Sequence, residues 1–275
     1  MLAQEFMRNA LVTGSVVGIA CGLVGWFLVL RAQVFAGDAL SHVAFTGALA
    51  AAAIGIDLKA GLFVATILGG AAIGALGDHA RADDAVIGTI FAWVLGIGVL
   101  CLSIFTTDAS GANGTAGVRV LFGSIFGLRS SDVRTSVLLA AVATLVLIVV
   151  ARPLLFASVD AAVAAAQGVQ VRALGVVFLA LVGLVAAEAT QAVGALLLLG
   201  LLSAPAAAAH RLTARPWVGL GLSASFALAS VWSGLSLAYA FPTLPPSTMV
   251  IAVAVTMYAI AMSCPGLARL TRVRP

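Results

Sequence analysis

Residues 9–30 read NALVTGSVVGIACGLVGWFLVL and contain no charged side chain. At about 1.5 Å of rise per residue, a helix of this length crosses a hydrocarbon layer of about 30 Å. The same character extends along the 275-residue chain, in which 63% of residues are hydrophobic and 9% are charged, whereas soluble domains carry about 25% charged residues. A soluble fold could not cover that much apolar surface. The composition therefore predicts an all-α polytopic membrane protein, with residues 1–275 forming one transmembrane domain.

Nine apolar segments are predicted to cross the membrane, or eight if the first or the seventh is misassigned. Besides 9–30, they are residues 39–56, 60–76, 85–105, 135–150, 173–187, 193–209, 217–240 and 248–264. The last two are separated by a segment with three prolines, 241–247, which ends a helix. Small residues at four-residue spacing favour close helix packing in lipid, as at Gly14, Gly18, Gly22, Gly70 and Gly74.

The orientation follows from the basic residues, because short loops rich in Lys and Arg favour the cytoplasm. If the tail with Arg269, Arg272 and Arg274 is cytoplasmic, nine basic residues lie inside and five outside, of the 14 in the chain. We therefore expect a cytoplasmic C-terminus and an extracytoplasmic N-terminus. Residues 107–131 are then an extracytoplasmic loop and gate region. The net charge of +4 indicates no nucleic-acid partner.

Asp38 and His42 lie at the start of the second apolar segment, where a charged side chain in hydrocarbon is costly. Their spacing of four residues puts a carboxylate and an imidazole on one helix face. This donor pair suits a divalent transition metal such as zinc or manganese, whereas calcium or magnesium would need more oxygen ligands. The alternatives are that Asp38 caps the helix N-terminus and that His42 is a hydrogen-bonded structural histidine.

Glu188 is the third ionisable residue within the apolar segments, beside Thr190 and Gln191. It is predicted either as an additional metal ligand or as a structural carboxylate that ends a helix or hydrogen-bonds to Gln191. The chain contains no GxxxxGK[ST] phosphate-binding loop, no HExxH and no GxSxG. We therefore expect a chain that is not an enzyme and has no ATP site of its own.

Four ordered motifs in the chain resemble the permease subunits of bacterial metal-ion ABC importers, which carry zinc, manganese or iron. The most specific motif is LRAQVFAGDALSHVA at 30–44. The others are RADDAVIGTIF at 81–91, LFGSI at 121–125 followed by Asp132, and VGALL at 193–197 followed by PAAA at 205–208. Ser124 replaces the usual acid of the third motif.

The resemblance implies a helical bundle of the type II ABC importer class in the bacterial inner (plasma) membrane. It further implies a homodimer with the metal pathway at its interface, a separate cytoplasmic ATP-binding subunit and an extracytoplasmic metal-binding protein. The family's pathway residues map onto Asp38 and His42. The metal is then transported cargo, and no permanently bound cofactor is expected.

Within a predicted cytoplasmic coupling segment, 153–170, the residues Asp160, Ala164 and Gly168 are similar to the family's D-x-x-x-A-x-x-x-G piece, which docks on the ATPase. Their physical interpretation is a short helix closed by a glycine, with small side chains that fit a groove on a partner. A simple linker between two spans is the alternative.

Zinc is the metal that the sequence favours over manganese or iron, because the spans contain no further hard oxygen ligands. Two other classes of function stay open. An ion-coupled secondary carrier could use Asp38, His42 and Glu188 as a relay, and it would transport metal without a partner subunit. A permease for a chelated or organic substrate would not depend on Asp38 or His42.

Overall fold

The protein is helical throughout the residues that its computed structural model describes, which are 4–76, 84–108, 123, 125–195 and 197–263. No strand occurs among them. The elements are α1 (Glu5–Leu30), α2 (Val34–Ala53), α3 (Leu58–Leu76), α4 (Asp84–Asp108), the 3₁₀-helix η2 (Ile125–Gly127), α6 (Ser130–Val159), α7 (Ala161–Ala166), α8 (Val171–Ala192), α9 (Leu198–Leu212), α10 (Pro216–Ala240) and α11 (Pro246–Ser263).

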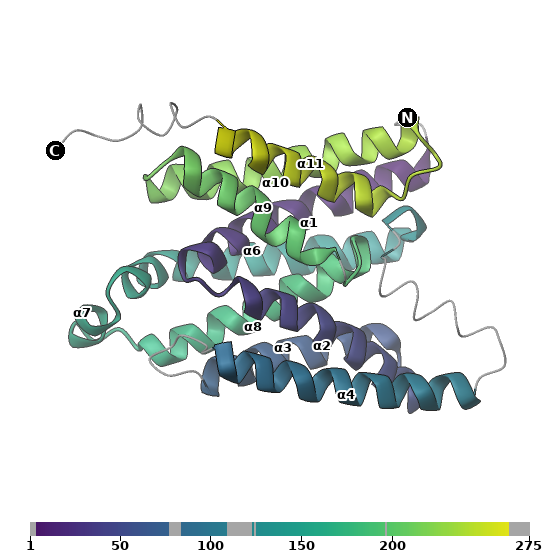
Figure 1. Cartoon of the computed structure of the whole chain (residues 1–275), viewed down its shortest axis with the longest axis horizontal. Helices are drawn as coiled ribbons and strands as arrows, with labels where there is room; N and C mark the ends of the chain where they lie inside the picture. The colour runs from purple at the N-terminus through teal and green to yellow at the C-terminus, as the bar shows by residue number, and fades with distance from the viewer. Residues whose placement is uncertain (1–3, 77–83, 109–122, 124, 196, 264–275) are drawn as a thin grey trace.

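Eight of these helices are long and apolar enough to cross a membrane. The remaining predicted span, residues 193–209, corresponds to α9, which has only 15 residues. It follows α8 through the buried residues Val193, Gly194 and Ala195. Because α8 and α9 join inside the protein, α9 needs fewer residues to reach the membrane surface from which α8 starts. The first residue of α1 and the last of α11 lie at opposite ends of the bundle (Figure 1), as an odd number of crossings requires. The predicted helical bundle with eight to nine spans is confirmed.

The helices approach each other closely through glycines. A Cβ atom added at Gly70 of α3 would lie 2.1 Å from the carbonyl oxygen of Leu179 in α8, and one at Gly183 of α8 would lie 2.2 Å from that of Thr66 in α3. Such distances are far inside van der Waals contact, so only glycine fits. The predicted packing role of Gly14, Gly18 and Gly22 is also confirmed, because all three face α10.

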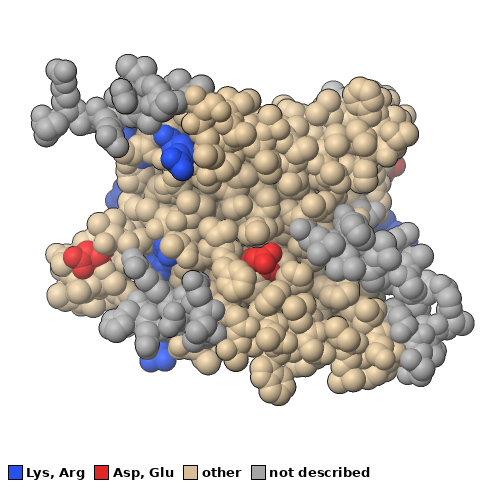
Figure 2. All heavy atoms as spheres, in the orientation of Figure 1, with Lys and Arg blue, Asp and Glu red and all other residues tan. Residues whose placement is uncertain are grey.

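The outward surfaces of α4 and α6 are apolar. Trp93 and Val99 of α4 are 71% and 68% exposed, and Val149 of α6 is 70% exposed. Figure 2 shows that the middle of one broad face is largely uncharged and that most of its charged side chains lie toward the ends of the bundle. Lipid is the solvent that suits this surface.

We expect Gly183→Ala to destabilise the bundle by about 1–3 kcal/mol, because the methyl group would force α3 and α8 apart. The matched control is Gly221→Ala in α10, where an added Cβ meets nothing within 4 Å. The control should gain about 0.5–1 kcal/mol from helix propensity. The unfolding temperature in detergent, measured for both variants, checks the prediction. An unchanged temperature for Gly183→Ala would contradict the close packing of α3 and α8.

Candidate metal site and coupling surface

Asp38 and His42 both lie inside α2, which begins at Val34. The residue that caps this helix is Gln33, so the alternative that Asp38 is an N-cap is wrong. Both side chains are half-buried, on the strip of α2 that also carries Phe35 and Phe45. In Figure 2 an acidic patch lies over α2, in the largely uncharged middle of the face. The predicted common face for the carboxylate and the imidazole is thus present.

Neither side chain of this pair makes a hydrogen bond or an ion pair with the described residues. His42 instead meets the ring of Phe91 in α4 edge-on, with 5.0 Å between ring centroids and an interplanar angle of 71°. Phe35 contacts the same ring at 6.1 Å. The alternative of a hydrogen-bonded structural histidine therefore has no partner in the part of the chain that is described. The pair offers a carboxylate and an imidazole nitrogen that are free to bind a ligand.

Glu188 lies elsewhere in the bundle, buried within α8 with 3% of its surface exposed. Neither carboxylate oxygen makes a hydrogen bond of good geometry, and the side chain that faces it is Ser136 of α6. No group of three His, Cys, Asp or Glu side chains forms among the described residues. Glu188 is therefore not brought together with Asp38 and His42 as a third ligand, and its predicted hydrogen bond to Gln191 is absent as well.

The predicted coupling segment contains a short helix of the expected form. α6 continues through Pro153 to Val159, and Asp160 then caps α7 by accepting a hydrogen bond of 2.9 Å from the backbone N–H of Val163. Gly168 closes the turn with φ +86°. The backbone N–H of Val169 donates to the carbonyl oxygen of Ala164 at 3.1 Å, so the glycine has the conformation that ends a helix.

The outer surface of α7 is apolar and open, and α7 stands at the end of the bundle where α11 finishes (Figure 1). Val159 and Val163 are 75% and 45% exposed, whereas Ala164 is fully buried against its own chain. Ala164 therefore holds α7 on the bundle, and the valines form the surface that a partner would meet. No sequence signal pointed to Val159 and Val163, because valines are common in the surrounding apolar segments.

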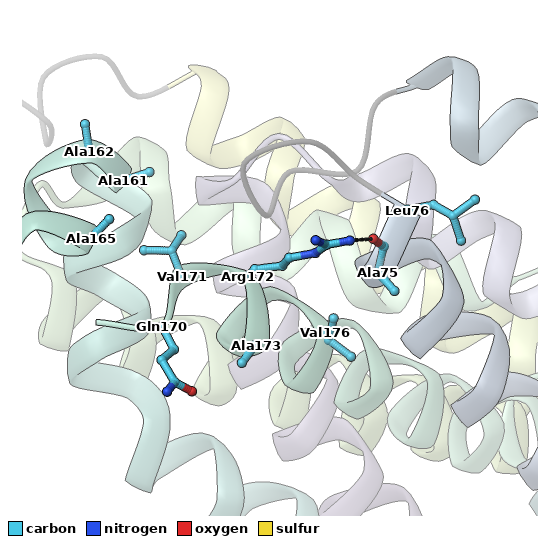
Figure 3. Close-up of a pocket in the computed structure, with 10 residues that line it drawn as sticks. All are labelled: Ala75, Leu76, Ala161, Ala162, Ala165, Gln170, Val171, Arg172, Ala173 and Val176. Atoms are coloured by element: carbon cyan, nitrogen blue, oxygen red, sulfur yellow. Dashed lines mark hydrogen bonds between the residues drawn. The ribbon is translucent and has the colours of Figure 1, made fainter. Parts of the chain in front are cut away.

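A groove of about 790 Å³ opens beside α7, between it and the ends of α3 and α8. On the α7 side the groove is lined by the small side chains of Ala161, Ala162 and Ala165 (Figure 3). Across the groove, the guanidinium of Arg172 donates a hydrogen bond of 2.9 Å to the carbonyl oxygen of Ala75. The groove can accept apolar side chains of a partner next to the exposed valines.

Most of the predicted loop and gate region, 107–131, lies outside the described residues, and so does Ser124. Within the described part, Gly123 has φ +71°, and an added Cβ would lie 2.5 Å from the carbonyl carbon of Val193. Asp132 forms an ion pair with Lys59 and accepts a hydrogen bond of 3.1 Å from the backbone N–H of Arg129. Asp132, which follows the third motif, therefore joins α6 to α3.

Arg31, one of the nine basic residues expected on the cytoplasmic side, is buried, with only 5% of its surface exposed. It lies in the turn between α1 and α2 and contacts Ser158 and Phe178, which are distant in sequence. Its position six residues before Gly37, the first residue of the GDALSH motif, is the sequence signal that could have identified it.

With this geometry established, the comparison of the sequence with known families is decisive. Residues 3–265 match the model of the ABC 3 transport family. The chain belongs to this family. The resemblance to metal-ion ABC importer permeases that the four motifs carry is confirmed.

Individual relatives and a solved structure agree with this membership. A protein of Halalkalibacterium halodurans named manganese transport system membrane protein MntC is 30% identical over 265 residues, which cover 95% of this chain and 88% of the relative. A Haemophilus influenzae protein named probable iron transport system membrane protein is 28% identical, with 87% of each chain covered. The structure of PsaBC from Streptococcus pneumoniae in complex with Fab superposes with a TM-score of 0.83 at 27% identity, covering 97% of this chain and 94% of that chain.

We expect Glu188→Gln to take up the transported metal like the unsubstituted protein and to unfold at the same or a higher temperature. An uncompensated buried charge destabilises a protein by about 3–5 kcal/mol, and the amide keeps the shape of the side chain without any charge. Uptake and unfolding temperature are measured on the same preparation. Glu188→Ala is the control, and it should unfold earlier because truncation leaves a cavity. Loss of uptake by folded Glu188→Gln would make Glu188 a metal ligand.

Proposed function

We propose that this protein is the permease subunit of an ATP-driven importer of divalent manganese, and that the metal passes between Asp38 and His42. Relatives named as manganese and iron systems support a transition metal, and manganese is named in the more similar of the two described above. Neither name supports zinc, which the sequence favours. Iron stays the alternative cargo within the same family.

The observation that supports the proposal most directly is that Asp38 and His42, half-buried on one face of α2, make no hydrogen bond or ion pair within the described residues. A metal pathway needs ligands that replace part of the hydration shell but release the ion again. A carboxylate and an imidazole one helical turn apart meet this need, since neither is held by an ion pair or a hydrogen bond in the described chain. The surrounding surface is apolar, so these two groups are the polar features that a cation would meet.

A second copy of the chain completes the site. Manganese prefers about six ligands in octahedral geometry, and one chain offers two side chains. A two-fold axis beside α2 would bring an identical pair from the second copy, giving four ligands, with water filling the remainder. Phe35, which is 41% exposed on the same strip, would be buried in such a dimer.

Energy would come from a separate cytoplasmic ATP-binding subunit, because the sequence has no phosphate-binding loop. The exposed valines and the groove beside α7 form the docking surface in this proposal. The end of the bundle that carries α7 and the end of α11 is then cytoplasmic. The permease would lie in the bacterial plasma membrane. Its opposite end would receive metal from an extracytoplasmic binding protein.

We expect Asp38→Asn and His42→Gln each to abolish manganese uptake while the permease still assembles with its ATPase. One missing ligand opens the pathway site but leaves the surface around α7 unchanged. Uptake of radioactive manganese into vesicles that contain the reconstituted complex is the measurement. The matched controls are Asp57→Asn, in the turn before α3, and His210→Gln, near the cytoplasmic end of α9, and both should transport normally.

Three results would contradict this function. Normal uptake by folded His42→Gln would refute the pathway assignment, as expected for a permease of chelated metal. Manganese uptake by the permease alone, driven by a proton gradient and indifferent to ATP, would indicate a secondary carrier. Uptake of zinc in strong preference to manganese would refute the choice of metal.

We expect Asp160→Ala and Gly168→Val to lower metal-stimulated ATP hydrolysis. The first removes the cap of α7, which costs about 1 kcal/mol, and the second places a branched side chain at φ +86°. ATP hydrolysis by the reconstituted complex, with and without manganese, is the measurement.

Controls for these two variants exist at the opposite end of the bundle. Asp57→Ala removes the cap of α3, where Asp57 accepts hydrogen bonds from the backbone N–H groups of Lys59 and Ala60. Gly55→Val strains a glycine with φ +76° that has open space around it. Both controls should keep metal-stimulated hydrolysis. Equal losses in the controls and in the α7 variants would return the segment 153–170 to a simple linker.

A further inference from the structure

Arg31 is a buried cation at the turn that joins α1 to α2. Its side chain is 5% exposed, and a buried charge is tolerated only where several partners satisfy it. The next residue, Ala32, has φ +55°, a left-handed conformation that is uncommon for any residue with a Cβ. Burial and an unusual backbone coincide here, so the turn has one specific structure.

The partners of Arg31 come from three parts of the fold. Its Nε donates to the side-chain oxygen of Gln33 at 3.0 Å, and its Nη1 donates to the hydroxyl oxygen of Ser158 in α6 at 3.1 Å. The guanidinium lies 5.6 Å from the ring centroid of Phe178 in α8. The Ser158 hydroxyl donates its own proton to the carbonyl oxygen of Leu154 at 2.5 Å, which leaves its lone pairs to accept from Arg31.

The contact with Ser158 lies next to the coupling segment. Ser158 is two residues before Asp160, the cap of α7, and no flexible linker separates them because α6 continues to Val159. The hydroxyl that Arg31 holds therefore lies next to the junction of α6 and α7, where a displacement of α7 would reach it first.

The contact with Gln33 lies at the start of the helix that carries the metal pair. The backbone N–H of Gln33 donates to the carbonyl oxygen of Leu28 at 2.9 Å, and that of Ala36 donates to the carbonyl oxygen of Gln33 at 3.0 Å. These bonds make the turn stiff up to the first residues of α2. Asp38 follows on the same continuous helix.

We propose that Arg31 is a positioning residue that transmits movement of α7 to α2 and thereby to Asp38 and His42. This inference rests on the proposed function. The rigid planar guanidinium donates in two directions at once, to α6 and to the start of α2, so the two helices move together. A lysine could not do this, because its single ammonium lacks the fixed fork of donors.

The experiment measures the number of manganese ions taken up per ATP hydrolysed by the reconstituted complex of permease and ATPase. Removal of a hydrogen bond to a charged group is expected to lower this ratio about ten-fold in Arg31→Gln and Arg31→Lys. Ser158→Ala should lower it in the same direction. The double variant Arg31→Gln/Ser158→Ala should be no worse than the more severe single variant, because both remove one interaction.

Arg152→Gln is the matched control, since Arg152 is an exposed arginine on the same helix as Ser158. Its ratio of manganese to ATP should equal that of the unsubstituted complex. A purely structural role for Arg31 would lower the unfolding temperature and the yield but leave the ratio unchanged. An unchanged ratio in folded Arg31→Lys and Ser158→Ala overturns the inference, even if Arg31→Gln does not fold. Absence of ATP-driven manganese uptake in the unsubstituted complex would instead refute the proposed function.

Discussion

Close backbone contact between helices is the constraint on which the fold depends. Lipid is as apolar as the side chains, so helices in a membrane associate through packing and interhelical hydrogen bonds. The glycines meet this requirement. A Cβ atom at Gly25 of α1 would lie 2.0 Å from the carbonyl oxygen of Leu202, and Gly70 and Gly183 make α3 and α8 equally close. α1, α2 and α8 are the most buried of the long helices.

This packing determines which surfaces stay open. α2 is held from the inside by α3 and α8, so its remaining strip, with Asp38 and His42, faces outward beside Phe91 of α4. A bundle closed by backbone contacts holds its polar pair at the edge of the protomer rather than in a channel through its centre. The proposed pathway therefore needs a second surface, and the half-burial of the pair in one chain is what an unfinished interface would produce.

Sequence alone could predict most of the fold, because the spans are set by local composition. It could not predict α6 beyond residue 150, since Arg152 and Pro153 are typical of a helix end, yet the helix reaches Val159. The candidate pair Asp38 and His42 was identifiable because both residues lie on one helix at a fixed spacing. The burial of Arg31 was not predictable, because it depends on a contact with Ser158, 127 positions away. The separation of Glu188 from the pair was not predictable either, because it depends on how α8 packs against α2.

Arg31 and the pair Asp38 and His42 differ in the polar contacts that they make, and the difference suits the roles proposed for them. Arg31 has hydrogen-bond partners on two elements and an aromatic ring on a third. A group that transmits movement must hold its partners in every state, and these contacts suit that proposed role. Asp38 and His42 have no polar partner in the described chain. A cargo site must bind and release, and ligands already held by strong partners would resist the ion. The same low-dielectric surroundings that make Arg31 a firm link therefore give the pair its attraction for a passing cation.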